Sequence, residues 1–451
     1  MKSLSLYKFR APDLKYFVSL LIITVIILVL CQSYFEINQS TVQVRPAESL
    51  LYSGEVNTVN VLKGGWQEFM KKDYHLFVHK SFIDLRQGVF GETAVVITTG
   101  ILRGRAFYEF NVNCKLYYEG EWITKRAALG QVPRSWRLEF TGWQSVHILC
   151  PISKVGPYPS QLILEDTKTL ERVFLPVEIA ESGSYNLIAC VPIVYGNFNS
   201  EALIEWFELQ RFFGVQKISM HVWKVSKENW EIFSYYKAQG LLDFYNLDTP
   251  YNITYTFEKN KSRAPAKPYF LEVLYSTDLT ECMLRNYLRS TYIMVMDLDE
   301  VLVPKKVNNY HELLNKFKEY DTINFQMKNF DITCNFMIPD ETHYFFKRPY
   351  KEIIAAGKES LLPAKSIHKA LKCLMFLQHN CVRPSKPYKK QMISSDEVVL
   401  RHYRKRGRCV QSRRHFVEDR SLNRFSPNIT ERLTIVKAKL LHSGKKQIGY
   451  A

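Results

Sequence analysis

The stretch YIMVMDLDEVLVP, from Tyr292 to Pro304, sets three carboxylates between two apolar runs. The first run is typical of a buried strand, so Asp297, Asp299 and Glu300 are expected at or just past the strand's end. Open α/β sheets bind their ligands at this edge. An ionised carboxylate in an apolar setting needs a compensating charge, and no lysine or arginine stands directly beside these three. The pattern therefore indicates a divalent cation, although an edge loop with solvated acids would have the same short motif.

Strands and helices alternate in the region before this stretch. An apolar run at 186–194, a one-sided helical pattern at 201–213 and an apolar run at 215–223 open the series. A second helix, a third strand and a long helix are expected next, at 226–239, 241–245 and 269–289. Such a series predicts a doubly wound α/β sheet. Downstream we expect a helix near 311–318, a strand at 322–327 and a less regular, basic remainder.

Short segments of alternating apolar and polar residues fill the range 75–183. Glycines and prolines punctuate them, which favours a small β-rich module. The preceding range, 36–74, is mostly polar without a strong period and is expected to form a stem. An irregular insertion at 247–268 is expected to be exposed.

An uncharged apolar segment lies near the start of the chain, from Tyr16 to Cys31. Its length suits a short membrane span, and a cleaved signal peptide is the competing reading. The following residues offer no clean small-residue cleavage site, which favours an uncleaved anchor over 16–35. Four basic residues precede the segment and are expected to stay cytosolic: Lys2, Lys8, Arg10 and Lys15. We therefore expect residues 1–15 to form a cytosolic tail and the rest of the chain to be lumenal.

Sequons and cysteines agree with a lumenal body. Four Asn-x-Ser/Thr sequons begin at Asn38, Asn252, Asn260 and Asn428. Of the nine cysteines one, Cys31, belongs to the apolar segment, which leaves eight. An even number is consistent with complete pairing in an oxidising compartment. No CxxC or Cys/His spacing indicates zinc.

The formal net charge is +17, and much of the excess lies in the stretch Arg401–Arg424. Nucleic acid is a poor partner for a lumenal chain. A solvated basic face and a site for phosphates or an acidic glycan remain open. Neither a P-loop nor a GxGxxG motif occurs at a strand-to-helix turn, which disfavours ordinary ATPases and dinucleotide enzymes. Carboxylates, a divalent cation and a basic region suit the diphosphate of a nucleotide sugar.

Several segments, in their order and spacing, resemble glycosyltransferase family 92. They are Ser184–Trp223, YYKAQGLLDFY, Thr280–Cys282, VMDLDEVLVP, Ala364–Ile367, His402–Arg404 and, ahead of these, the FIDLR run Phe82–Arg86. The resemblance implies an α/β fold with a GT-A-like doubly wound mixed sheet over 184–440, followed by a tail at 441–451. It also implies a single-pass type II Golgi enzyme that holds a manganese-type ion at its DxD motif. Family members of known activity transfer galactose from UDP-galactose with inversion, including onto fucose of N-glycan cores.

The resemblance also implies roles for individual residues. Asp297 would face the ribose and the metal, and Asp299 would be the direct metal ligand. Glu300 would orient the motif or act as the base. A further metal ligand is expected from His402, with His379 as the alternative. Diphosphate contacts are expected from Lys365 and Arg404, and a disulfide from Cys190 to Cys282.

Some points stay open at this stage. Other candidates for the base are Asp331, Asp340, Glu341 and Glu352. Val301 stands where family members usually carry an aromatic residue. The sequence thus predicts a transferase that moves a hexose, most specifically galactose, to a glycan acceptor. A membrane-anchored glycan-binding protein without turnover and a metal-dependent phosphodiester hydrolase are the rivals, and the oligomeric state is not predicted.

Overall fold

The structure is a computed structural model of the chain. It describes residues 65–69, 75–86, 94–103, 110–132, 143–153, 156–247, 249–250, 269–331, 345, 350–351, 365–404, 416–417 and 421–446. The expected anchor at 16–35 and the sequons Asn38, Asn252 and Asn260 lie outside these residues. Within them, no helix is long and apolar enough to span a membrane. Asn428 is exposed near the start of the last helix.

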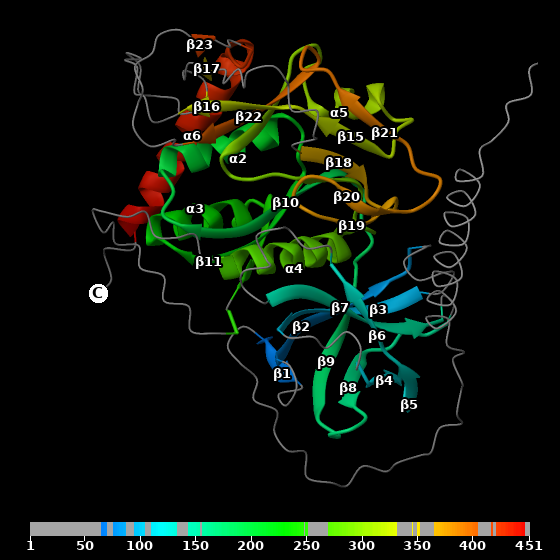
Figure 1. The fold of residues 1–451 in the computed structure, drawn as a ribbon. Coiled ribbons are helices and arrows are strands. Elements are labelled where there is room, and N and C mark those ends of the chain that lie inside the picture. The colour runs from blue at the N-terminus through cyan, green and yellow to red at the C-terminus, as the bar shows by residue number, and fades with distance from the viewer. Residues whose placement is uncertain are drawn as a thin grey trace, which may run out of the picture. The chain divides into compact units, whose positions relative to one another are not determined.

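A β-rich module forms the first part of the described chain (Figure 1). Its strands are β1 (Gln67–Phe69), β2 (His75–Asp84), β3 (Ala94–Arg103), β4 (Val112–Tyr118), β5 (Glu121–Arg126), β6 (Ala128–Gln131), β7 (Trp143–Ile152), β8 (Gln161–Asp166) and β9 (Arg172–Ile179). Among the described residues they make one sheet in the order β5-β4-β8-β9-β2-β3-β7-β6, with β1 paired to β2. Strand β1 falls within the range 36–74 expected to form a stem. Its last residue, Phe69, and the preceding Trp66 are fully buried, so this part of the range belongs to the module.

The second part is a mixed α/β structure. It contains β10 (Tyr185–Gly196), α2 (Ser200–Phe212), β11 (Lys217–Val225), α3 (Lys227–Ala238), β12 (Leu242–Asn246), α4 (Tyr269–Asn286) and β13 (Ser290–Val295). The strands β12, β11, β10 and β13 run parallel, as the alternating pattern predicts. Asn199 and Ser226 cap α2 and α3 by accepting hydrogen bonds from backbone N–H groups. The expected mixed sheet is confirmed.

The chain after β13 completes this sheet and builds a smaller one. The elements are β14 (Glu300–Pro304), α5 (Tyr310–Lys316), β15 (Thr322–Phe325), β16 (Met327–Asp331), β17 (Tyr350–Lys351), β18 (Lys365–Lys369), β19 (Cys373–Phe376), β20 (Cys381–Pro384), β21 (Lys390–Ile393), β22 (Val398–Arg404), β23 (Phe416–Val417), the short 3-10 helix η5 (Asn423–Phe425) and α6 (Ser426–Lys446). Strands β18, β15 and β21 extend the large sheet beside β13, whereas β14, β22 and β16 form a separate sheet. The apolar runs on either side of the acids therefore belong to different sheets.

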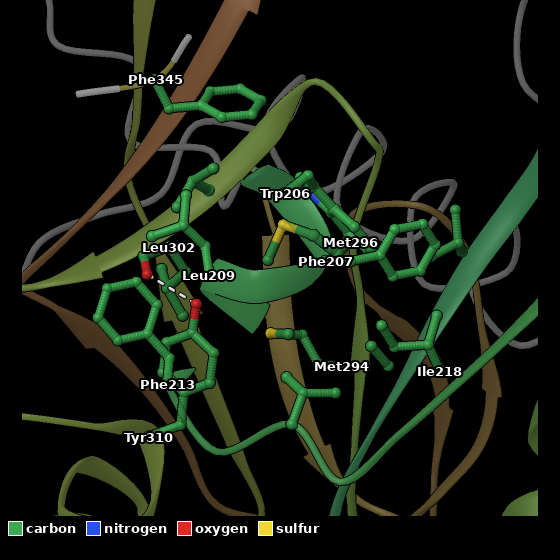
Figure 2. Close-up of a cluster of buried hydrophobic side chains, with 14 of the residues drawn as sticks. Trp206, Phe207, Leu209, Phe213, Ile218, Met294, Met296, Leu302, Tyr310 and Phe345 are labelled. Carbon is green, nitrogen blue, oxygen red and sulfur yellow. Dashed lines mark hydrogen bonds between the residues drawn. The ribbon is translucent and has the colours of Figure 1, made fainter. Parts of the chain in front are cut away.

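Aromatic and aliphatic side chains pack between the large sheet, α2 and β14 (Figure 2). Phe207 stacks on Tyr236 with ring centroids 4.2 Å apart. Tyr310, fully buried, donates a 2.7 Å hydrogen bond to the carbonyl of Leu302, drawn as a dashed line in Figure 2. This core fixes β14 against α2, and β14 begins at the third acid of the motif.

Helix α4 contacts both the large sheet and the β-rich module (Figure 1). A disulfide joins its Cys282 to Cys190 of β10, the pair that the family resemblance implies. Leu279 and Met283 share a hydrophobic cluster with this disulfide and with Phe82 of the module. Two further disulfides are Cys114–Cys150 and Cys373–Cys381, while Cys334 and Cys409 lie outside the described residues.

One buried histidine of the large sheet should make stability depend on pH. Burial lowers the pKa of His368 to about 3, and its Nδ1 lies 2.7 Å from Thr322 Oγ1. As pH falls below an ordinary histidine pKa of about 6.5, the unfolded chain takes up a proton that the folded chain refuses. The stabilisation is thus present above pH ~6.5 and is lost toward pH ~3.

Through this group we expect the free energy of unfolding to fall by about 1 to 2 kcal/mol between pH 6.5 and 5. Urea denaturation at several pH values in that range should show that the free energy of unfolding depends less steeply on pH in His368→Gln than in the wild type. The matched variant His75→Gln changes a histidine whose side chain is 51% exposed, and it should keep the wild-type slope. Identical slopes in wild type and His368→Gln would contradict this assignment.

Candidate active site

The three acids lie on a short turn between two strands of different sheets. Strand β13 ends at Val295, and Glu300 begins β14. The backbone N–H of Glu300 donates to the carbonyl of Asp297 at 3.1 Å, and Glu300 Oε2 accepts from the N–H of Asp297 at 3.1 Å. The carbonyl of Asp299 accepts from Tyr403 N–H at 2.8 Å. These bonds fix the turn at the carboxyl edge of the parallel strands.

A buried lysine lies beneath the turn. Lys365 Nζ is 3.0 Å from Asp297 Oδ2 and 3.1 Å from Glu300 Oε2, and its side chain is only 1% exposed. Lys365 begins β18, which pairs antiparallel with β13. Its buried positive charge compensates the negative charges of Asp297 and Glu300, two of the three acids. The sequence-based role of a diphosphate contact requires an accessible ammonium, whereas this one is enclosed by carboxylates.

The two buried acids respond differently to this setting. Burial acts to raise the pKa of Asp297, but the charge of Lys365 and the hydrogen bonds from Lys365 and Gln378 outweigh it, so the pKa is lowered. Burial raises the pKa of Glu300 to about 7, with Lys365 opposing that rise. The two acids hold the pKa of Lys365 above its ordinary value, although burial acts to lower it. Asp297 is therefore the ionised partner of Lys365.

His402 packs against the same acids, and its side chain is only 3% exposed. In the β14–β22 register it stands opposite Glu300. Its Nε2 is 3.1 Å from Asp299 Oδ2, while its Nδ1 is 3.4 Å from Glu300 Oε1 and 3.0 Å from Met327 Sδ. A carboxylate behind the second ring nitrogen is the usual support of a metal-binding histidine, because it fixes the ring's orientation. The Asp299 side chain is 52% exposed and that of His402 is 3% exposed, so the carboxylate faces solvent while the imidazole is buried behind it.

Gln378 is a site residue that the sequence reading missed. Its Nε2 donates to Asp297 Oδ2 at 2.9 Å. It lies between β19 and β20, in the loop closed by the Cys373–Cys381 disulfide. Among the described residues, both side-chain bonds to Asp297 reach Oδ2, and none reaches Oδ1. No local sequence signal marks Gln378, because only the fold brings it to an acid 81 residues earlier.

The side chains around the turn suit a divalent cation, but they do not form a complete coordination sphere. Within the described part of the chain, no three His, Cys, Asp or Glu side chains already converge on one point. Asp299 offers an exposed carboxylate oxygen, the buried His402 offers an imidazole nitrogen 3.1 Å from it, and Asp297 lies on the same turn as Asp299. Manganese accepts this mixture of ligands. A bound diphosphate would have to supply further oxygens.

The structure places the remaining predicted residues as follows. The side chain of His379 is exposed, and its backbone carbonyl accepts a 3.0 Å hydrogen bond from Ser366 Oγ. Arg404 ends β22, but its side chain lies outside the described residues. The same holds for the side chain of Asp331 and for Asp340, Glu341 and Glu352.

A buried tryptophan couples the turn to the core. Trp206 of α2 donates from Nε1 to the carbonyl of Glu300 at 2.8 Å. We expect Trp206→Phe to destabilise the fold by about 2 kcal/mol, because the carbonyl loses its buried donor. We also expect the variant to lower the activity of this site several-fold, because the turn loosens.

The matched control is Tyr310→Phe, which removes the hydroxyl bonded to Leu302 on the same strand. It should cost about 1 kcal/mol and leave activity unchanged. Chemical denaturation and initial-rate assays measure both effects. Equal losses of activity in the two variants would show that the coupling is not specific to the turn.

A family model described as Glycosyltransferase family 92 matches residues 185–437. A curated relative, beta-1,4-galactosyltransferase galt-1 of Caenorhabditis elegans, is 22% identical in an alignment of length 278 that covers 57% of this chain and 59% of the relative. The aligned part therefore spans less than two thirds of that relative's own length.

Similar solved structures include S. aureus TarS 1–349, which is 15% identical with a TM-score of 0.25 and covers 48% of this chain and 60% of that one. TarS 1–349 in complex with UDP-GlcNAc is 16% identical at the same TM-score, covering 49% and 59% of the two chains. TM-scores this low support no conclusion about fold or ligand.

Proposed function

This chain belongs to glycosyltransferase family 92, and from that premise we propose that it transfers galactose from UDP-galactose to a glycan acceptor with inversion. The observation that carries the proposal is the exposed carboxylate of Asp299, 3.1 Å from the buried imidazole of His402, on a turn whose other two acids are held by buried Lys365. The galactosyltransferase name of the curated relative supports galactose as the sugar. We further propose a type II orientation in the Golgi membrane, since the apolar segment at 16–31 follows a basic tail.

In this proposal Asp299 and His402 hold Mn²⁺, with Asp297 beside them. When bound, the cation would supply positive charge that stabilises the leaving diphosphate. Lys365 keeps Asp297 ionised and oriented, and Glu300 supports the His402 ring from behind. Both oxygens of Glu300 face donors on the protein side, so we assign it an organising role. The carboxylate that takes the acceptor proton then comes from elsewhere in the chain.

The nucleotide is proposed to lie along the carboxyl ends of the parallel strands. At the ends of β10 and β11, Tyr195 and Trp223 have ring centroids 6.1 Å apart. Tyr195 is half-buried and lies near the edge where these sheets bind ligands. A uracil ring can stack on an aromatic ring of this kind.

Purified protein incubated with UDP-galactose and Mn²⁺ tests the proposal. We expect UDP release that requires both the cation and a fucosylated glycan acceptor. Binding of UDP without turnover on a broad acceptor panel would instead support a glycan-binding protein without activity. Acceptor-independent cleavage of the donor would support hydrolysis.

A further inference from the structure

A buried ion pair ends the strand β2 of the β-rich module. Arg86 Nε and Nη2 donate to Asp84 Oδ1 and Oδ2 at 2.8 and 2.7 Å, and the two side chains are 1% and 0% exposed. The ring of Tyr287 in the loop after α4 covers the guanidinium at 5.0 Å. Buried ion pairs are weak contributors to net stability, since desolvation offsets most of their attraction. Their geometry is nevertheless well defined, because the guanidinium is a planar fork.

The remaining donors of Arg86 reach across to the transferase part of the chain. Nη1 donates to the carbonyls of Ala370 and Cys373 at 3.3 and 2.7 Å, and Nη2 donates to that of Leu374 at 3.1 Å. With the two bonds to Asp84, every N–H of the guanidinium is used. A module residue thus determines where the β18–β19 turn and the start of β19 lie.

That segment carries both groups that hold Asp297. Lys365 begins β18 on one side of the turn, and Gln378 follows β19 on the other. The Cys373–Cys381 disulfide closes the loop of Gln378, and Ser366 Oγ donates to the carbonyl of its neighbour His379 at 3.0 Å. Arg86 is bonded to the first residue of this closed loop, Cys373. A shift of the loop would move the amide that donates to Asp297.

We propose that Arg86 is a positioning residue for the metal-binding turn, acting through the disulfide-closed loop 373–381 and Gln378. The inference rests on the proposed use of the DxD acids for Mn²⁺ and UDP. It gives the β-rich module a part in donor binding. Asp84 orients the Arg86 guanidinium, and the hydrogen bond from Gln378 links the position of the loop to the position of the Asp297 carboxylate.

The test measures binding of UDP with Mn²⁺ to the full-length protein by calorimetry. Arg86→Lys keeps the positive charge beside Asp84 but loses the fork that reaches the three carbonyls. We expect Kd to rise about tenfold in Arg86→Lys and by a similar factor in Gln378→Ala, about the effect of supporting residues at metal sites. In the double variant the two effects should not multiply, because both act through one contact.

The matched control is Arg285→Lys. Arg285 of α4 also joins the module to the transferase part, with its guanidinium over Phe82 at 4.8 Å and over Tyr245 at 4.3 Å, but it does not contact the loop. It should lower the melting temperature about as much as Arg86→Lys and leave Kd within twofold of wild type. Multiplying effects in the double variant, or an unchanged Kd in Arg86→Lys, would overturn the inference while the proposed function stood. Failure of wild type to bind UDP with Mn²⁺ would overturn both.

Hydrogen exchange on the wild type gives a second test that needs no folded variant. Adding UDP and Mn²⁺ should slow amide exchange in both 373–381 and 83–86. Slowing in the loop alone would overturn the inference, because the module would then not share in binding.

Discussion

Replacing Asp299 with asparagine is expected to lower kcat/KM for transfer from UDP-galactose by about 100-fold to 1,000-fold, because a metal ligand supplies several kcal/mol of charge stabilisation. The side chain is 52% exposed, and its one described side-chain contact is His402 at 3.1 Å. The free energy of unfolding should therefore change by less than about 0.5 kcal/mol. Steady-state kinetics over a Mn²⁺ titration, together with urea denaturation, separate the two quantities.

The control for this change is Asp396→Asn. Asp396 is an exposed acid that precedes β22 and lies far along the chain from the 297–300 turn. It should behave as wild type in both assays. Unchanged activity in Asp299→Asn would remove the metal assignment, whereas loss of activity accompanied by unfolding would show that the residue acts on the fold.

Replacing Lys365 with methionine is expected to have the largest effect on stability, about 3 kcal/mol or more, because two buried carboxylates lose their shared cation. In the wild type, Asp297 and Glu300 lie 3.0 and 3.1 Å from Lys365 Nζ. In the variant they would face an uncharged side chain instead. For a chain of this size a loss of about 3 kcal/mol lowers the melting temperature by roughly 3 °C. Donor binding should weaken as well, since Asp297 loses one of its two side-chain donors.

Lys369→Met is the matched control, on the same strand and with a single acid. Lys369 Nζ is 3.2 Å from Asp321, but its side chain is 28% exposed, and such pairs contribute less than about 1 kcal/mol. Adding Glu300→Gln to Lys365→Met should recover part of the lost stability, because one uncompensated acid is removed. Equal destabilisation by Lys365→Met and Lys369→Met would contradict the central position given to Lys365.

Local signals in the sequence account for the elements around the site. Asn199 and Ser226 cap their helices, and Gly214 and Gly240 follow helices with φ of +100° and +71°, a conformation that favours glycine. The apolar run before Asp297 predicted the buried strand. These features depend on neighbours within a few residues, so the sequence reveals them directly.

The contacts within the site depend on strand register, which local sequence does not specify. His402 stands opposite Glu300 because β14 pairs with β22, and Lys365 reaches Asp297 because β18 pairs with β13. For Lys365 and His402, family resemblance supplied the residues but not their partners. Gln378 and the loop contacts of Arg86 had no signal, because each joins segments far apart in the chain. The apolar run after the acids also gave no sign that it enters a second sheet.

The central claim is that Asp299 and His402 hold Mn²⁺ for the UDP-sugar, and pulsed electron paramagnetic resonance of the Mn²⁺–UDP complex tests it most directly. An imidazole ligand modulates the Mn²⁺ echo through its coordinating nitrogen. The account predicts this modulation in wild type, its loss in His402→Gln and its retention in His379→Gln. Modulation that persists in His402→Gln, or that is absent from a wild-type complex with bound Mn²⁺, would contradict the claim.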